Sequence, residues 1–176
     1  MAKAAAGVRL DINGRGVGHV ETGLPVLNSL LKQMAEIARF NLVLDIEPGD
    51  AEAEVEAAGA ALGVALTELL HDERARGYGS ESLASAEALA HVVIERNPEP
   101  LVVTNVDLTD AGIGGLGTDI VRRFLESFAD HAGLVLHVRL LDGTDSTHVL
   151  EAIFKALGAA LAQACEHPSK PIGGNE

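Results

Sequence analysis

A histidine and a glutamate in the last quarter of the chain could bind a metal ion or move a proton. His148 precedes Glu151 by three residues, so in a helix the imidazole and the carboxylate share one face. Imidazole and carboxylate together can hold a transition metal. Many pairs at this spacing are only surface neighbours, so the spacing alone leaves both interpretations open.

Glu56 is the counterpart of Glu151 in an internal repeat, and each stands near the start of a predicted helix. A carboxylate there is favoured by the helix dipole, and the same position could also serve a metal ligand or an acid–base group. The counterpart of His148 is Ala53, which cannot bind a metal. We therefore treat Glu56, His148 and Glu151 as candidate catalytic residues and as the residual candidates for a metal site.

Four further polar side chains are of the types that bind phosphate. Lys155 follows His148 by seven residues, roughly two helical turns later on the same side. Arg76 lies in a segment whose glycines allow the backbone to approach a ligand. Ser169 and Lys170 lie in the C-terminal tail. Cationic and hydroxyl groups are what a phosphate requires, although they are also ordinary surface residues.

Other classes of function find little support in the sequence. Cys165 is the only cysteine, so an intramolecular disulfide or a multi-cysteine metal site is excluded. The remaining six histidines show no ligand-like clustering, and there is no Ser-His-Asp order, phosphate-binding glycine loop or dinucleotide fingerprint. The net charge of −13 argues against nucleic acid or an anionic membrane as a partner.

Composition indicates a soluble domain with an aliphatic core. Hydrophobic residues make up 47% of the 176 residues, whereas aromatic residues make up only 3%. The first residues lack the apolar run of a signal peptide, and we expect no apolar stretch to be long enough to span a bilayer. We therefore expect a cytoplasmic protein.

The elements that must position the candidate residues occur twice in the same order. Alternating apolar residues predict strands at 8–12, 19–22 and 40–46, the first two joined by a turn at Asn13-Gly14, and helical stripes predict helices at 25–38 and 54–70. In the second half the same patterns predict strands at 90–94, 101–106 and 134–140, and helices at 120–132 and 147–165. Each half is thus β-β-α-β-α.

A nearly constant shift relates the two halves. Adding 94 superposes the stripe of the first helix and the strand after it on their counterparts, and adding 95 superposes Glu56 on Glu151 and Leu62-Gly63 on Leu157-Gly158. We therefore predict an α+β protein of two duplicated half-units, 1–80 and 81–176, which form one pseudo-two-fold unit. Each helix must bury an apolar face, so we expect the helices packed between two outer sheets.

Several motifs resemble those of the imidazoleglycerol-phosphate dehydratase family. The segment 22–31 (TGLPVLNSLL) resembles the family's T-G-I-P-F-F-D-H-M-L, and 60–66 (AALGVAL) resembles its A-L-G-x-A-L helix. Residues 151–156 (EAIFKA) match its E-A-x-F-K-A, 134–137 resemble the strand before that motif, and 168–170 (PSK) are similar to its P-S-T-K-G. The resemblance covers nearly the whole chain from Val8 onward.

This resemblance implies a fold, a cofactor and an assembly. The family consists of two β-β-α-β-α halves and forms a large cubic assembly. Histidines and glutamates at subunit boundaries hold two manganese ions there, which support the loss of water from imidazoleglycerol phosphate. By resemblance, the chain is therefore expected to form a homo-oligomer, and Arg76, Lys155, Ser169 and Lys170 could keep part of a phosphate pocket.

Most of the metal-binding histidines implied by the resemblance are replaced. The D-H-M motif falls on Asn28-Ser29-Leu30, and the first H-H-x-x-E falls on 52–56 (EAEVE), so only Glu56 remains there. The second falls on 147–151 (THVLE), which keeps His148 and Glu151. The family's M-D-E-A-L falls on 85–89 (SAEAL), and Glu99 stands where a phosphate-binding arginine belongs.

Three functional hypotheses follow from these departures. The first is a degenerate relative without the two-manganese site, for which no cofactor is expected. The second is a working carbon–oxygen lyase with a rearranged metal site, built from Glu52, Glu56, His148 and Glu151, which would still require manganese. The third is a protein that binds, or acts on, another small phosphorylated molecule. The first is our main expectation. The apolar stripes that specify the fold are intact, and a fold persists more easily than a function whose ligands are replaced.

Overall fold

The computed structural model describes residues 6–106 and 118–168, which contain seven strands and four helices. The strands are β1 (Ala6–Asp11), β2 (Gly18–Glu21), β3 (Asn41–Ile46), β4 (Tyr78–Ser85), β5 (Ala88–Arg96), β6 (Leu101–Thr104) and β7 (Leu134–Asp142). The helices are α1 (Pro25–Ala38), α2 (Ala51–His71), α3 (Thr118–Ala132) and α4 (Ser146–Cys165).

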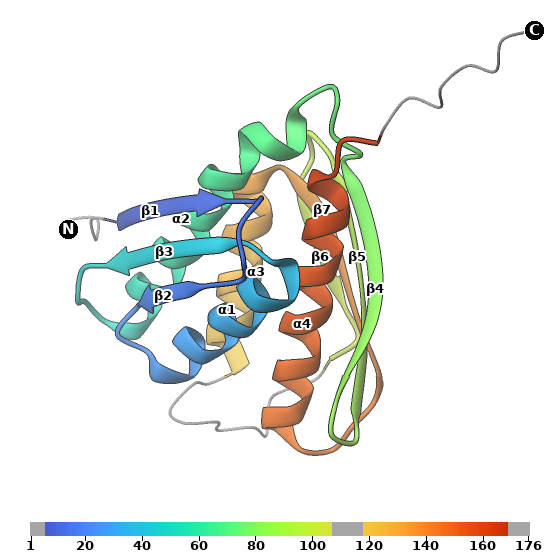
Figure 1. Ribbon diagram of the computed structural model, residues 1–176. Helices are drawn as coiled ribbons and strands as arrows, with labels where there is room; N and C mark the ends of the chain where they lie inside the picture. Colours follow the sequence, from blue (N-terminus) through green and yellow to red (C-terminus); the bar gives the residue numbers. More distant parts are fainter. Residues whose placement is uncertain (1–5, 107–117, 169–176) are drawn as a thin grey trace, which may run out of the picture.

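The helices lie between two mixed sheets (Figure 1). One sheet has the order β1-β3-β2, and the other has the order β4-β5-β7-β6. Helix α2 packs mainly on α3, and α1 packs on α4, so each half buries its helices against those of the other half. The predicted α+β architecture, with sheets outside and helices inside, is confirmed.

Strand pairing shows the duplication directly. Val8 lies opposite Leu44 in the antiparallel β1–β3 pair, and Val92 lies opposite Val138 in the antiparallel β5–β7 pair. Strand β2 runs parallel to β3, as β6 runs parallel to β7. Leu44 and Val138 differ by the 94 positions found in the sequence, whereas Val8 and Val92 differ by 84, because the second half has a longer link before its first helix. The division at residue 80 stays a prediction.

Two details differ from the sequence-based expectation. Strands β1 and β2 are not hairpin partners, because β3 lies between them after a parallel β2–α1–β3 crossover. Strand β4 was not predicted. Its sequence, YGSESLAS, is mostly small and polar, so it carries no strong apolar alternation, although it pairs with β5 along its whole length.

The core is mainly aliphatic, and three of its phenylalanines form an aromatic cluster. Phe124 of α3 lies 5.7 Å from Phe154 of α4 and 6.1 Å from Phe128, measured between ring centroids. All three rings are fully buried. Because the cluster joins α3 to α4, it contributes to holding these two helices together.

Helix α4 corrects one expectation about membranes. By length and composition it is apolar enough to cross a bilayer, contrary to the sequence analysis. However, 67% of its most apolar stretch is buried inside the fold, where it contacts α1, β4 and β5. Its hydrophobicity is therefore that of a core helix.

The aromatic cluster gives a test of this packing. We predict that Phe154→Ala lowers the free energy of unfolding by about 3–5 kcal/mol, because it leaves a cavity among buried side chains. Leu141→Ala is the control, because Leu141 is 57% exposed and its truncation should change stability by about 0.5 kcal/mol or less. Urea unfolding measures both variants, and equal losses would contradict the described core.

Candidate functional site

The first turn of α4 holds His148 against a loop of the neighbouring sheet. Asp145 caps the helix, because its carboxylate accepts hydrogen bonds from the backbone N–H groups of Thr147 (2.9 Å) and His148 (3.2 Å). The imidazole Nδ1 of His148 lies 2.6 Å from Oε2 of Glu87, in the turn between β4 and β5. Oε1 of Glu87 accepts the N–H of Asp145 at 2.8 Å.

These contacts shift two ionisation equilibria. The Asp145 N–H, the backbone N–H of Glu87 itself and the His148 imidazole all stabilise the Glu87 carboxylate, and together they lower its pKa to about 2. The hydrogen bond that the imidazole donates to the Glu87 carboxylate raises the pKa of His148. Both residues are therefore charged at mildly acidic pH, and they form an ion pair within one chain.

Glu151 and Lys155 contact the same hairpin from the following turns of α4. The hydroxyl of Ser85 donates to Oε2 of Glu151 at 2.5 Å, and Nζ of Lys155 donates to the carbonyl of Ala84 at 3.3 Å. His148, Glu151 and Lys155 thus lie on one face of α4, as their spacing predicts. The contacts of all three are with the chain's own β4–β5 hairpin.

Glu56 belongs to a separate group on α2. Its Oε1 accepts a hydrogen bond from Nη1 of Arg123 on α3 at 3.1 Å, and Nη2 of the same guanidinium lies 3.7 Å from Glu52. One arginine therefore faces both exposed carboxylates of the first helical turns. The three candidate catalytic residues form two groups, and the structure does not bring Glu56 to His148 or Glu151 within one chain.

The donors present in one chain do not fit a manganese pair. In the described ranges, no three His, Cys, Asp or Glu side chains gather in a way that could hold a metal ion. At the positions implied by the resemblance, Ser29 and Ala53 offer no imidazole. The Glu56 carboxylate already faces a guanidinium cation, and His148 is bound by a carboxylate.

Arg76 is the phosphate candidate with the most distinctive surroundings. Its backbone N–H donates to the carbonyl of Glu166 at 2.8 Å, which places it at the C-terminal end of α4. Its guanidinium carbon lies 4.5 Å from the centre of the Tyr78 ring. Its Nε is buried without a hydrogen-bond partner. A buried donor without a partner is costly and would be satisfied by an anionic ligand.

Of the other phosphate candidates, only Lys155 lies in the part of the chain that the structure describes, and it is not near Arg76. Lys155 lies eleven residues before Glu166, about 16 Å along the axis of α4 at the usual helical rise. Ser169 and Lys170 lie outside the described residues, which end two positions after Glu166. Glu99, at the position implied for an arginine, is exposed in the loop before β6.

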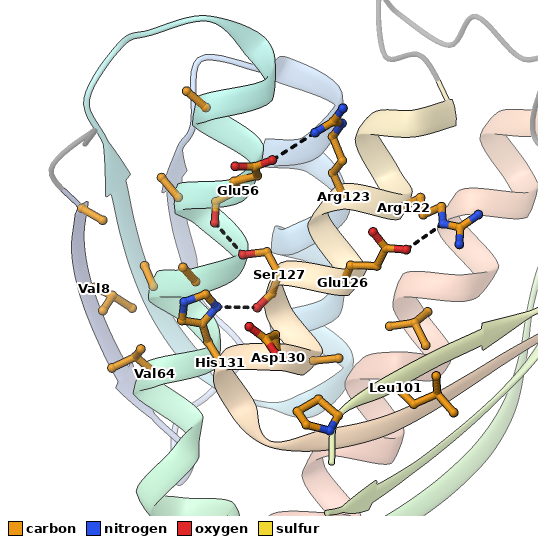
Figure 2. A pocket seen from close by; sticks show the side chains of 18 residues that line it. Val8, Glu56, Val64, Leu101, Arg122, Arg123, Glu126, Ser127, Asp130 and His131 are labelled. Carbon is orange, nitrogen blue, oxygen red and sulfur yellow. Dashed lines mark hydrogen bonds and ion pairs between the residues drawn. The ribbon is translucent and has the colours of Figure 1, made fainter. Parts of the chain in front are cut away.

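A groove lies elsewhere, along α2 and α3 (Figure 2). It has a volume of about 1120 Å³. Val8, Ala57, Ala61 and Val64 contribute apolar surface, and the Glu56–Arg123 pair lies at one end. This groove does not include His148 or Glu151, so the groove and the retained histidine are separate features.

Sequence reasoning missed the partners that engage the candidate residues. Ser85 and Glu87 lie in a segment that the resemblance aligns with M-D-E-A-L, and that motif was the available signal for a role next to His148. Arg123 had no such signal, because its proximity to Glu56 depends on the packing of α3 against α2.

Relatives support the motif-based resemblance. The sequence model of the family described as imidazoleglycerol-phosphate dehydratase matches residues 22–161. A protein of that name from Chromobacterium violaceum is 39% identical over 173 residues, which cover 94% of this chain and 86% of the relative. Another from Cereibacter sphaeroides is 36% identical over 170 residues, which cover 94% of this chain and 87% of the relative.

Solved structures agree with this assignment. The crystal structure of imidazoleglycerol-phosphate dehydratase from Staphylococcus aureus superposes with a TM-score of 0.84 at 26% identity, covering 93% of this chain and 94% of that one. The enzyme from Pyrococcus furiosus shares the fold, with a TM-score of 0.85 at 22% identity over 99% of this chain and 96% of that one. The chain belongs to the imidazoleglycerol-phosphate dehydratase family.

Proposed function

We propose that this histidine-biosynthesis family member is a degenerate homologue that does not carry out manganese-dependent dehydration. The observation that carries the proposal is that the surviving ligand-type side chains are bound by the chain itself. Arg123 faces Glu56, Glu87 pairs with His148, and Ser85 donates to Glu151. A metal would have to displace these partners and would gain only one imidazole from the motif positions.

The partners of Glu56 and His148 also favour an electrostatic role for these two residues that differs from metal binding. In a metal site, carboxylates and imidazole surround a cation that acts on the substrate. Here a guanidinium supplies the positive charge beside Glu56, and a second carboxylate joins His148. These internal pairs engage the helix starts without a bound ion.

A second candidate function is binding of a small phosphorylated molecule. The buried, unsatisfied Nε of Arg76 favours it, because an anion at this corner would accept that hydrogen bond. The flanking backbone contacts to the end of α4 fix the position of the arginine. Such binding is compatible with loss of dehydration, since it needs no metal.

The main proposal is tested by manganese content and turnover. We predict that the protein purified with added manganese holds clearly less than one ion per chain and does not convert imidazoleglycerol phosphate. The Chromobacterium violaceum relative, treated identically, is the control for metal loading and assay. Stoichiometric manganese together with dehydratase turnover would refute the proposal and support the rearranged-site alternative.

The phosphate candidate is tested by thermal shift with sugar and imidazole phosphates at millimolar concentration. We expect a ligand-dependent rise in Tm, because a ligand bound only by the folded state stabilises it by mass action. Arg76→Gln should remove the rise. Arg74→Gln, a nearby arginine that pairs with Asp72, should keep it. If the wild type shows no shift with any ligand, phosphate binding is wrong.

The His148–Glu87 pair predicts a defined pH dependence. The stabilisation that the pair provides through His148 is fully present below the pKa of the unfolded state, about 6.5. It is lost as pH rises through the raised pKa of the folded state. The pair's contribution through Glu87 is full above about 4.5 and is lost as pH falls toward about 2. We therefore predict that Glu87→Gln lowers the free energy of unfolding most between about pH 4.5 and about pH 6.5.

Urea unfolding of the Glu87→Gln variant across this range measures the effect. The stability gap to wild type should narrow at alkaline pH, where His148 is neutral. Glu99→Gln, at an exposed carboxylate outside the pair, should show no such pH-dependent gap. A gap for Glu87→Gln that stays constant from acidic to alkaline pH would show that the ion pair is not formed.

A further inference from the structure

Strand β4 and helix α4 show how the fold covers one side of the molecule. Strand β4 pairs antiparallel with the outer edge of β5 and lies against α4 (Figure 1). Ser85 and Ala84 bind α4 through Glu151 and Lys155. Farther along, the Gln163 amide accepts the N–H of Ser80 at 3.0 Å. The strand thus follows α4 over much of the helix length.

The first half contains the counterparts of β5 and α4, but its described residues contain no counterpart of β4. By the repeat, β1 corresponds to β5, and α2 corresponds to α4. Within the described ranges, β3 is the only strand that pairs with β1, so the other edge of β1 has no strand beside it. The edge adjoins the groove along α2, to which Ala6 and Val8 contribute. An unpaired edge presents backbone donors and acceptors that can bind another strand.

Burial differs between the two halves as a missing strand would predict. Val92 and Ile94 of β5 are fully buried, whereas the corresponding Val8 and Leu10 of β1 are only half-buried. On the helices, Ala152 and Ala156 are fully buried, whereas their counterparts Ala57 and Ala61 are half-buried. Val64, next along the same face of α2, is 59% exposed. Apolar surface that β4 helps cover in the second half is therefore open in the first.

We propose that the edge of β1 and the adjoining face of α2 form a strand-acceptor groove, which binds an extended basic peptide segment of a partner protein antiparallel to β1. Backbone hydrogen bonds to the strand edge would supply affinity, and alternate side chains would enter the groove along α2. The inference concerns a surface remote from His148 and does not depend on the proposed loss of metal chemistry.

The side chains expected in the peptide are inferred from those of β4 and from one difference between the halves, Glu68 in place of Gln163. In β4, Gly79, Glu81 and Leu83 are the more buried side of the strand, so small and apolar residues suit these inward positions. Glu81 accepts a hydrogen bond from Gln163 at 3.3 Å. The counterpart of Gln163 on α2 is Glu68, which would repel a glutamate. A lysine or arginine is therefore expected at the matching peptide position.

Charge favours a basic segment as the occupant of the groove. The chain carries a net charge of −13, so a basic segment is attracted at long range. Asp130 on α3 lines the groove and adds exposed negative charge, and Glu68 is exposed farther along α2. The two groove arginines, Arg122 and Arg123, face glutamates.

Fluorescence anisotropy with a labelled peptide tests the groove. The probe has the sequence of Tyr78–Ser85 with Glu81→Lys, and the unchanged sequence and a scrambled peptide are comparisons. We expect saturable binding of the lysine peptide and about two- to fivefold weaker binding of the unchanged peptide, the range of one exposed ion pair. Absence of saturable binding at millimolar peptide, or equal binding of the scrambled peptide, would overturn the proposal.

A groove variant and a matched control locate the binding. Ala57→Arg combined with Ala61→Arg should weaken binding more than tenfold, because the side chains occupy the groove. Val17→Arg, at an exposed residue on the loop before β2, should leave it unchanged. Circular dichroism confirms that each variant is folded. Equal binding by both variants, or concentration-dependent self-association that only the groove variant abolishes, would exclude this use of the site.

Discussion

The fold depends on one constraint: each half has two amphipathic helices on a single sheet, and their second apolar faces must be buried against the other half. The pairing of α2 with α3 and of α1 with α4 satisfies this requirement. Phe124 and Phe154, from α3 and α4, meet in the shared core. Because burial is supplied by helix stripes and inward strand positions, it does not require any residue of a metal site. This separation explains how the architecture persists while motif histidines are replaced.

Most of the fold could be predicted from the sequence, because the repeated apolar stripes and alternating strands show locally which side chains are buried. The shift that maps Leu44 onto Val138 leads to equivalent pairing in the two sheets, where Val8 and Val92 are the respective antiparallel partners. Two features were not accessible in this way. Strand β4 is polar and small, and it is held by α4 and β5 rather than by its own alternation. The insertion of β3 between β1 and β2 follows from a crossover that a turn signal at Asn13-Gly14 does not reveal.

The candidate site was predictable in its residues but not in their partners. Spacing placed His148 and Glu151 on one face of a helix, and the structure has both facing the same hairpin. Their engagement by Ser85 and Glu87, and that of Glu56 by Arg123, depends on tertiary contacts between segments more than sixty residues apart. In the described structure, Glu56 and His148 are engaged by ion pairs within the chain, and Glu151 accepts a hydrogen bond from Ser85.

The most direct test of this account observes His148 itself. Histidine side-chain NMR during titration with manganese reports whether the paramagnetic ion approaches the ring. If Glu87 holds the imidazole as described, the His148 resonances keep their line width at stoichiometric manganese and show only the titration of the ion pair. Selective broadening of His148 at one ion per chain would show that the metal displaces Glu87, and would contradict the central claim.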